Sequence, residues 1–275
     1  MPELPEIYNR AIEMKQHLPG RTITGIEVIQ PKCLNLPEEE FAACLTGACI
    51  RDVSYHGKWL ILETTQGYLL FNMGMGGEIL LTNRLSLPEK RRLIFDLDGL
   101  SGDDRPCLSV NFWWFGYAHF VPAGQLDSHP LTAKLGPNAI DLSLQEFKAL
   151  LSGQRSRLKS FLLDQSRLAG IGNAYIHDIL FLAHLHPLRK IDSLTEAEIE
   201  GLYQAIHAGL QPSIDKGGAF YETGLLGQKG GFQMEDIIIG YREGTPCPNC
   251  AAPVEKIKTG STSSFICPQC QPLNL

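Results

Sequence analysis

The sequence lacks the features that would place the protein in or across a membrane. None of its apolar runs approaches the roughly 20 residues that a membrane-spanning helix needs. The first ten residues, MPELPEIYNR, include two acids and no apolar stretch, which excludes a secretory signal of the usual kind. Apolar residues still make up 44% of the 275 residues, enough for a packed core, so we expect a soluble, folded, intracellular protein.

The sequence also lacks an excess of positive charge. Its formal net charge of -6 argues mildly against binding to nucleic acid, since proteins that bind DNA usually present a basic face. One segment departs from this average, because residues 147–163 hold Lys148, Arg155, Arg157 and Lys159 without an acid. This strip is either a solvated helix face, which charge alone favours, or a set of phosphate contacts.

Internal repeats and low-complexity tracts are absent, and the chain instead changes its pattern along its length. A helix is predicted over residues 3–18, where apolar residues recur at helical spacing from Ile7 to Leu18. Short β-rich runs then alternate with turn residues as far as about residue 122. These runs are TITGIEVI, WLILET, YLLFNM, EILLT, RLIFDL and CLSVNFWWF, and they predict a β-sandwich or barrel.

The second half of the sequence has a helical pattern. Helices are predicted at residues 144–152, 155–164, 172–184, 194–209 and 212–216, followed by a glycine-rich mobile loop at 217–234. We therefore predict an α+β multidomain fold. Its parts are an N-terminal helix and β-sandwich domain (1–130), a linker (131–143), a helical domain with its loop (144–234) and a β-hairpin module (235–275).

Four of the eight cysteines are paired near the end of the sequence. Cys247-Pro-Asn-Cys250 is followed by sixteen residues and then by Cys267-Pro-Gln-Cys270. This spacing predicts one structural zinc ion per chain, held by four thiolates. The ion would supply the folding energy of a module too small to bury much apolar surface. The alternative, a redox dithiol pair, needs a thioredoxin-like strand–helix–strand context that the sequence does not show.

Several segments, in order along the whole chain, resemble the formamidopyrimidine-DNA glycosylase and endonuclease VIII family. They are MPELPEI at 1–7, HGKW around Lys58, NMGMGG around Met75, HPLTAKLGP at 129–137, LLDQSRLAGIGNAYIHDILFLAHLHP at 162–187, and the cysteine spacing. The resemblance implies a helix and β-sandwich domain, a helix–two-turn–helix domain and a zinc finger. It also implies a monomeric enzyme of the bacterial cytoplasm, associated with the nucleoid, that acts on double-stranded DNA with damaged bases or abasic sites.

The resemblance assigns the chemistry to the beginning of the chain. Enzymes of the family turn a damaged base out of the duplex, cut its glycosidic bond and cleave the strand by β,δ-elimination. Removal of Met1 would give Pro2 a free secondary amine, which could attack the sugar C1′ and form an iminium. Glu3 would help open the sugar ring as an acid/base, and Lys58 would hold phosphate and assist elimination. Without the resemblance, Pro2 and Glu3 would merely begin a helix, and Lys58 would be a surface lysine.

The resemblance also implies DNA contacts in both halves of the chain. Asn173, in the run AGIGN, and Lys159 correspond to family residues that contact the DNA backbone, although Asn173 could also be a helix N-cap. Met75 resembles the methionine that enters the void left by the flipped base, and a core methionine is the alternative. Phe115 belongs to the same predicted insertion surface.

Three positions depart from the family pattern. Trp113 stands where an arginine normally pairs with the orphaned base, Thr262 where an arginine grips phosphates, and Asn72 where a histidine lies near the backbone. Tryptophan can stack in the gap but cannot read a base edge as arginine does, so we expect a lesion preference altered from 8-oxoguanine. In the alternative, Trp113 packs inside the sandwich and Trp114 points outward.

Two functions remain in competition after these observations. The favoured one is a DNA glycosylase of base excision repair with AP lyase activity. The alternative is a binding protein for DNA lesions or abasic sites, with the same fold and little or no glycosylase activity. It explains the missing arginines but not the retained Pro2, Glu3 and Lys58. A zinc-ribbon module of RNA biology would explain the cysteines alone.

Overall fold

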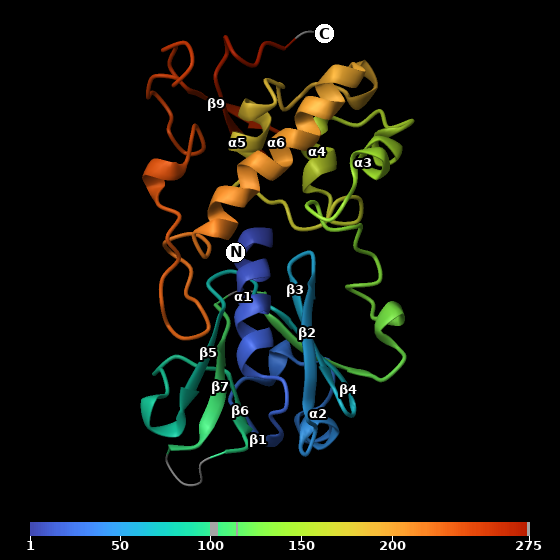
Figure 1. Cartoon of the computed structure of the whole chain (residues 1–275), viewed down its shortest axis with the longest axis vertical. Helices are drawn as coiled ribbons and strands as arrows, with labels where there is room; N and C mark the ends of the chain where they lie inside the picture. The colour runs from blue at the N-terminus through green and yellow to red at the C-terminus, as the bar shows by residue number, and fades with distance from the viewer. Residues whose placement is uncertain (100–103, 114, 274–275) are drawn as a thin grey trace. The chain divides into compact units, whose positions relative to one another are not determined.

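The chain forms two compact units, which we call unit 1 and unit 2. The computed structural model describes residues 1–99, 104–113 and 115–273, and Figure 1 shows the whole chain. Unit 1 consists of Met1–Lys134 together with Lys216–Gly231, and unit 2 of Leu135–Asp215 together with Phe232–Leu275. In the part of the chain that the structure describes, no helix has both the length and the apolar composition needed to cross a membrane.

Unit 1 begins with the helix that the sequence predicts. Helix α1 spans Leu4–His17 and has Pro5 in its first turn, where a missing N–H costs nothing. Its apolar side, from Leu4 to Met14, is buried against the strands, as the helical spacing of these residues requires.

Two four-stranded antiparallel sheets form the body of unit 1. One has the order β1 (Ile23–Val28), β6 (Leu93–Leu97), β7 (Pro106–Asn111), β5 (Glu78–Asn83), and the other β2 (Ile50–His56), β3 (Trp59–Thr64), β4 (Gly67–Asn72), β8 (Tyr117–Pro122). Both sheets contribute to one core, which helix α2 (Glu38–Leu45) extends with Phe41. The prediction of an N-terminal helix and β-sandwich is confirmed.

Unit 2 combines four helices with a two-stranded hairpin among its described residues. The helices are α3 (Leu144–Leu151), α4 (Leu158–Leu163), α5 (Ile176–Leu182) and α6 (Glu196–Asp215), and the hairpin pairs β9 (Glu255–Thr259) with β10 (Thr262–Ile266). Ser143 begins α3 by accepting a hydrogen bond from the Glu146 N–H. Phe181 of α5 packs in one apolar cluster with Cys247, Val254 and Phe265, so the hairpin module shares a core with the helices.

Short 3-10 helices connect these elements. They span Pro31–Cys33, Arg84–Ser86 and Leu126–Ser128 in unit 1, and Ile191–Ser193 and Met234–Asp236 in unit 2.

Two details of the predicted elements are wrong. The two helices expected at 194–209 and 212–216 are one helix, α6, which continues through Pro212. Proline removes one backbone hydrogen bond, but the buried Leu210 and Ile214 on either side keep the helix packed. The run CLSVNFWWF is a strand only as far as Asn111.

The division between the units differs from a simple cut along the sequence. The sequence places the glycine-rich residues 217–234 in the helical domain, whereas Lys216–Gly231 groups with unit 1. We call Lys216–Gly231 the returning segment, because it brings the chain back to unit 1 after α6.

Candidate functional site

The N-terminus of α1 is buried and carries acidic side chains. Pro2 and Glu3 are both buried, and Glu3 is the residue that precedes the first helical turn. The backbone N–H of Glu3 donates to Glu6 Oε2 over 2.8 Å, which fixes the geometry of this turn. Acidic side chains are favourable here because the helix dipole is positive at its N-terminus.

The returning segment packs on α1 through two carboxylates. The Ala219 N–H donates to Glu6 Oε1 over 3.1 Å, and the Leu225 N–H donates to Glu13 Oε2 over 2.7 Å. Glu6 and Glu13 are seven residues apart, about two helical turns, and therefore lie on the same face of α1. The helix that begins at the predicted nucleophile thus holds a segment more than 200 residues away in sequence.

Glu222 lies in the returning segment, in the turn that follows the contact with Glu6. Its N–H donates to the Ala219 carbonyl over 2.9 Å. Burial raises the pKa of Glu222 to about 7, and the negative charge of Glu6 adds to the rise, whereas the amino terminus, Arg10 and Lys229 act in the opposite direction. The sequence does not mark Glu222 as a functional residue, because an acid in a glycine-rich segment carries no pattern that reveals such distant neighbours.

Lys58 lies in the turn between β2 and β3. Figure 1 shows this turn at the same end of unit 1 as the beginning of α1. The side-chain amide of Asn72 donates to the Lys58 carbonyl over 3.2 Å, and its oxygen accepts from the Gly74 N–H over 3.1 Å. The residue that replaces a family histidine therefore connects the Lys58 turn to the loop that carries Met75.

Met75 and Trp113 lie on two loops that are joined by a backbone hydrogen bond. The Trp113 N–H donates to the Met75 carbonyl over 3.2 Å. Their side chains are 47% and 71% exposed, and Phe115 is 73% exposed. A Cβ at Gly76 would lie 3.1 Å from the Trp113 Cβ, so glycine permits the close contact between the loops. The alternative that buries Trp113 in the sandwich is wrong, and Trp114 lies outside the described residues.

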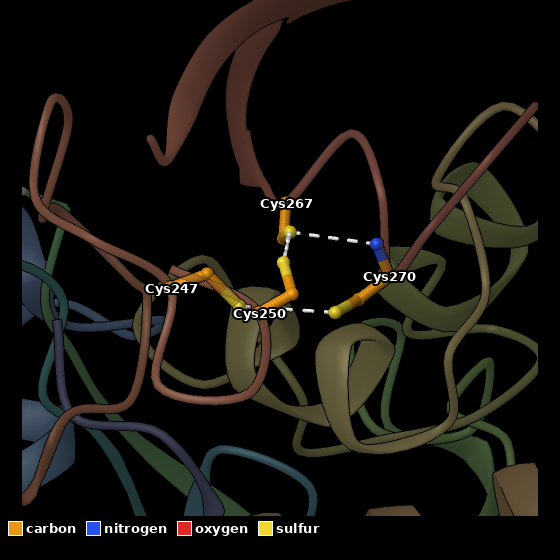
Figure 2. Close-up of side chains that lie close together, drawn as sticks. All are labelled: Cys247, Cys250, Cys267 and Cys270. Carbon is orange, nitrogen blue, oxygen red and sulfur yellow. Dashed lines mark hydrogen bonds between the residues drawn. The ribbon is translucent and has the colours of Figure 1, made fainter. Parts of the chain in front are cut away.

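The four paired cysteines of unit 2 converge, as Figure 2 shows. Their sulfur atoms all lie within 4.8 Å of one another, with Cys247 Sγ 3.8 Å from Cys270 Sγ and Cys250 Sγ 3.4 Å from Cys267 Sγ. A tetrahedral zinc ion with Zn–S bonds of about 2.3 Å separates its sulfur ligands by about 3.8 Å. These residues form a site for one structural zinc ion, which confirms the prediction from their spacing.

Lys159 belongs to helix α4, and its side chain is buried against the hairpin. Its side chain is 3% exposed, and Nζ donates to Thr259 Oγ1, Thr262 Oγ1, Ser263 O and Ser264 Oγ over distances of 2.6 to 3.2 Å. Burial lowers the pKa of Lys159 to about 8. The structure therefore surrounds this ammonium with oxygen atoms of the hairpin and connects Lys159 directly to Thr262, and the phosphate contact that the resemblance implies stays a prediction.

Asn173 faces a small cavity in unit 2. The cavity has a volume of about 300 Å³ and is lined by Asn173, His177, Tyr241, Lys256, Thr262, Ser263 and Phe265. Asn173 Oδ1 is buried and has no hydrogen-bond partner among the described residues. The Lys256 ammonium lies 5.8 Å from the centre of the Phe265 ring, so this cavity carries a cation next to the uncharged Thr262.

The predicted site residues therefore fall into two groups. Pro2, Glu3, Lys58, Met75, Trp113 and Phe115 belong to unit 1, and Asn173, Lys159, Thr262 and the four zinc ligands belong to unit 2. Within unit 1 the structure brings Met75 to Trp113, and within unit 2 it brings Lys159 to Thr262. Their roles on DNA stay predictions.

Comparison with known proteins gives matches along nearly the whole chain. Residues 1–110 match the formamidopyrimidine-DNA glycosylase N-terminal domain, residues 135–223 its H2TH domain, and residues 244–273 the zinc finger found in FPG and IleRS. The formamidopyrimidine-DNA glycosylase of Pelotomaculum thermopropionicum is 34% identical over 98% of this chain and 99% of that protein. This chain belongs to the formamidopyrimidine-DNA glycosylase family. The family member from Streptococcus mutans is 31% identical over 98% of this chain and 99% of its own length.

Solved structures of the formamidopyrimidine-DNA glycosylase family agree with the fold. A Lactococcus lactis Fpg mutant in complex with DNA containing Fapy-dG aligns with a TM-score of 0.88, at 28% identity, over 98% of this chain and 100% of that one. Lactococcus lactis Fpg in complex with DNA containing an abasic site aligns with a TM-score of 0.87, also at 28% identity, over 98% and 99% of the two chains. The predicted family and its three structural parts are thus confirmed.

Proposed function

We propose that this protein is a DNA glycosylase with AP lyase activity that excises damaged bases from double-stranded DNA and cleaves the resulting abasic sites. The observation that carries the proposal is the beginning of α1, where Pro2 and Glu3 are buried together at an acidic helix start in a chain of this family. The solved relatives in complex with Fapy-dG and abasic DNA support the same substrate class. We further propose that it acts as a monomer in the bacterial cytoplasm, at the nucleoid.

The proposed chemistry begins when Met1 is removed and Pro2 gains a free secondary amine. The amine nitrogen attacks the sugar C1′, the bond from C1′ to the base breaks, and the base leaves. The bond from C1′ to the ring oxygen then opens, that oxygen receives a proton with the help of Glu3, and an iminium forms between Pro2 and the sugar. Elimination from the iminium cleaves the strand, with Lys58 holding phosphate near the lesion.

The lesion preference in this proposal differs from that for 8-oxoguanine opposite cytosine. Trp113 is exposed beside Met75, and an exposed aromatic ring can stack on a base whatever its identity. Arginine at this position would instead donate paired hydrogen bonds to one particular base. We therefore propose broad tolerance of the base opposite the lesion.

The proposal is tested by trapping the iminium with borohydride on abasic DNA. Wild-type protein with Met1 removed is expected to form a stable protein–DNA adduct. Pro2→Gly and a chemically blocked N-terminus are expected to reduce the adduct by more than about tenfold, because both alter the nucleophilic secondary amine. Lys58→Ala is the matched control, since it removes another candidate amine and leaves the N-terminus intact.

Two results would contradict the proposal in different ways. An undiminished adduct in both N-terminal variants, together with its loss in Lys58→Ala, would move the nucleophile to Lys58. Tight binding of abasic DNA without any adduct or strand cleavage by the wild type would instead support a lesion-binding protein of the same fold.

A further inference from the structure

The returning segment brings a third acidic residue, Glu222, to the start of α1, where Glu3 and Glu6 lie. Glu6 Oε1 accepts from the Ala219 N–H, and the turn from Ala219 to Glu222 is closed by the hydrogen bond from the Glu222 N–H to the Ala219 carbonyl. The Gly230 N–H donates to the Glu222 carbonyl over 3.3 Å, which ties the two ends of the segment together. The backbone of Glu222 is therefore fixed on both sides relative to Glu6.

Close approach of the segment to α1 depends on a glycine. Gly218 has a φ of +95°, and a Cβ there would lie 3.2 Å from Glu6 Cγ. The Leu81 N–H also donates to the Leu225 carbonyl over 2.8 Å, so strand β5 holds the far side of the segment. These contacts from α1, β5 and the segment itself position Glu222 as part of a built site rather than on a free loop.

The charges around Glu222 come from two sides. On α1 they are Glu6, Arg10 and the amino terminus that precedes the helix, and in the returning segment the charge is Lys229. Arg10 is itself buried and donates to Glu13 and to the Ile79 carbonyl, so its charge is shared with other partners. With a pKa of about 7, raised by burial and by Glu6, the carboxyl is both protonated and ionised in comparable amounts near neutral pH.

We propose that Glu222 donates the proton that the damaged base needs as it leaves. This inference rests on the proposed function and adds a catalytic residue to it. The neutral Pro2 amine forms its bond to C1′ and becomes an ammonium, while the bond from C1′ to the base breaks. The electron pair of that bond goes to the base, which takes the proton of the Glu222 carboxyl and leaves neutral, and Glu222 becomes a carboxylate. Ring opening then moves the ammonium proton to the sugar oxygen, so the excision step needs no other reactant.

The experiment compares two reactions of the full-length protein under single-turnover conditions. One substrate is duplex DNA with a ring-opened formamidopyrimidine, which needs base departure, and the other is a preformed abasic site, which does not. Glu222→Gln, which cannot donate an acidic proton, is expected to slow excision by about 10²-fold, the lower end of the range for general acid catalysis. Cleavage of the abasic site is expected to stay within about threefold, since the base is already absent.

The pH profile and two further variants separate proton donation from a structural role. In the wild type, excision is expected to fall as pH rises above about 7, because the protonated form of Glu222 is the donor, and this limb should vanish in Glu222→Gln. Glu222→Asp should recover part of the excision rate. Glu39→Gln, an exposed acid on α2, is the matched control and should behave as the wild type.

The outcomes distinguish this inference from the proposed function. Unchanged excision in Glu222→Gln, or an equal loss on both substrates, would overturn the role of Glu222 while wild-type activity upholds the enzyme. A wild type that neither excises the base nor cleaves abasic DNA would overturn the proposed function, and the role of Glu222 with it.

Discussion

The two units carry different kinds of functional groups. In unit 1, carboxyl groups dominate the start of α1, where Glu3, Glu6 and Glu222 come together, and the exposed loop groups are Met75 and Trp113. Such groups can move protons and stack on bases, and neither task depends strongly on salt. These are the groups that the proposed chemistry and the proposed insertion into the duplex would use.

Unit 2 instead combines a metal site with cations. The zinc ligands hold the base of the hairpin, Lys159 is buried inside it, and Lys256 lies at the cavity with Asn173. Cations that neutralise phosphates give salt-dependent binding. The acidic net charge of the chain therefore says little about DNA binding, because the positions of individual cations, and not the sum of all charges, decide which surface can contact phosphates.

Removal of zinc is expected to have the largest effect and to act on unit 2 alone. Chelation, or Cys250→Ser, should abolish DNA binding and unfold the hairpin, since structural zinc contributes about 10–16 kcal/mol in small zinc fingers. Elemental analysis should find about one zinc per chain before chelation and none after it. Cys44→Ser, which changes a cysteine of unit 1, is the control and should retain zinc.

Unit 1 should keep its own thermal transition after zinc is removed, because its core contains none of the zinc ligands among the described residues. Circular dichroism during heating can separate the two transitions. A metal-free protein that stays fully folded and binds DNA normally would contradict the structural role of zinc.

Replacement of Trp113 tests whether unit 1 contributes salt-independent stacking on the bases. Trp113→Ala should weaken binding to abasic sites opposite A, C, G and T alike, by roughly 1–3 kcal/mol, because stacking does not depend on base identity. Trp113→Arg should instead gain selectivity among the four opposite bases. Binding titrations on the four duplexes measure both. A strong preference of the wild type for cytosine, or unchanged binding by the alanine variant, would show that Trp113 does not enter the duplex.

Charge changes at the hairpin test the salt-dependent phosphate contacts of unit 2. They should have the smallest effect. Lys256→Ala should make the slope of log K against log salt shallower by about 0.9, the value for one lost phosphate contact. Thr262→Arg should steepen it by about the same amount, although the new guanidinium would meet the ammonium of Lys159 and lower the stability of unit 2. Lys190→Ala, an exposed lysine of unit 2, is the control.

The salt slopes of these variants show which unit contacts the DNA backbone. Unchanged slopes in both hairpin variants would mean that the hairpin does not reach the DNA backbone. A change of slope in Trp113→Ala would show that the loops of unit 1 also carry part of the phosphate contact.

Features that depend on residues close together in the chain could be predicted from the sequence. Helix α1 follows from apolar spacing over a few turns, and the zinc site follows from two CxxC pairs, because each pair fixes two ligands within one turn. The end of strand β7 at Asn111 could not be predicted in the same way. Phe112 and Trp113 have the composition of a strand, but β7 ends at Asn111 and β8 begins only at Tyr117.

Contacts between residues far apart in the chain became visible only in the folded structure. Helix α6 continues through Pro212 because burial of its neighbours outweighs the lost hydrogen bond. Lys159 turns into the hairpin because hydroxyl and carbonyl oxygens about 100 residues later surround its ammonium. Glu222 reaches the start of α1 because Glu6 and Glu13 hold the returning segment. Each case depends on the free energy of contacts between segments far apart in the chain, which local spacing does not encode.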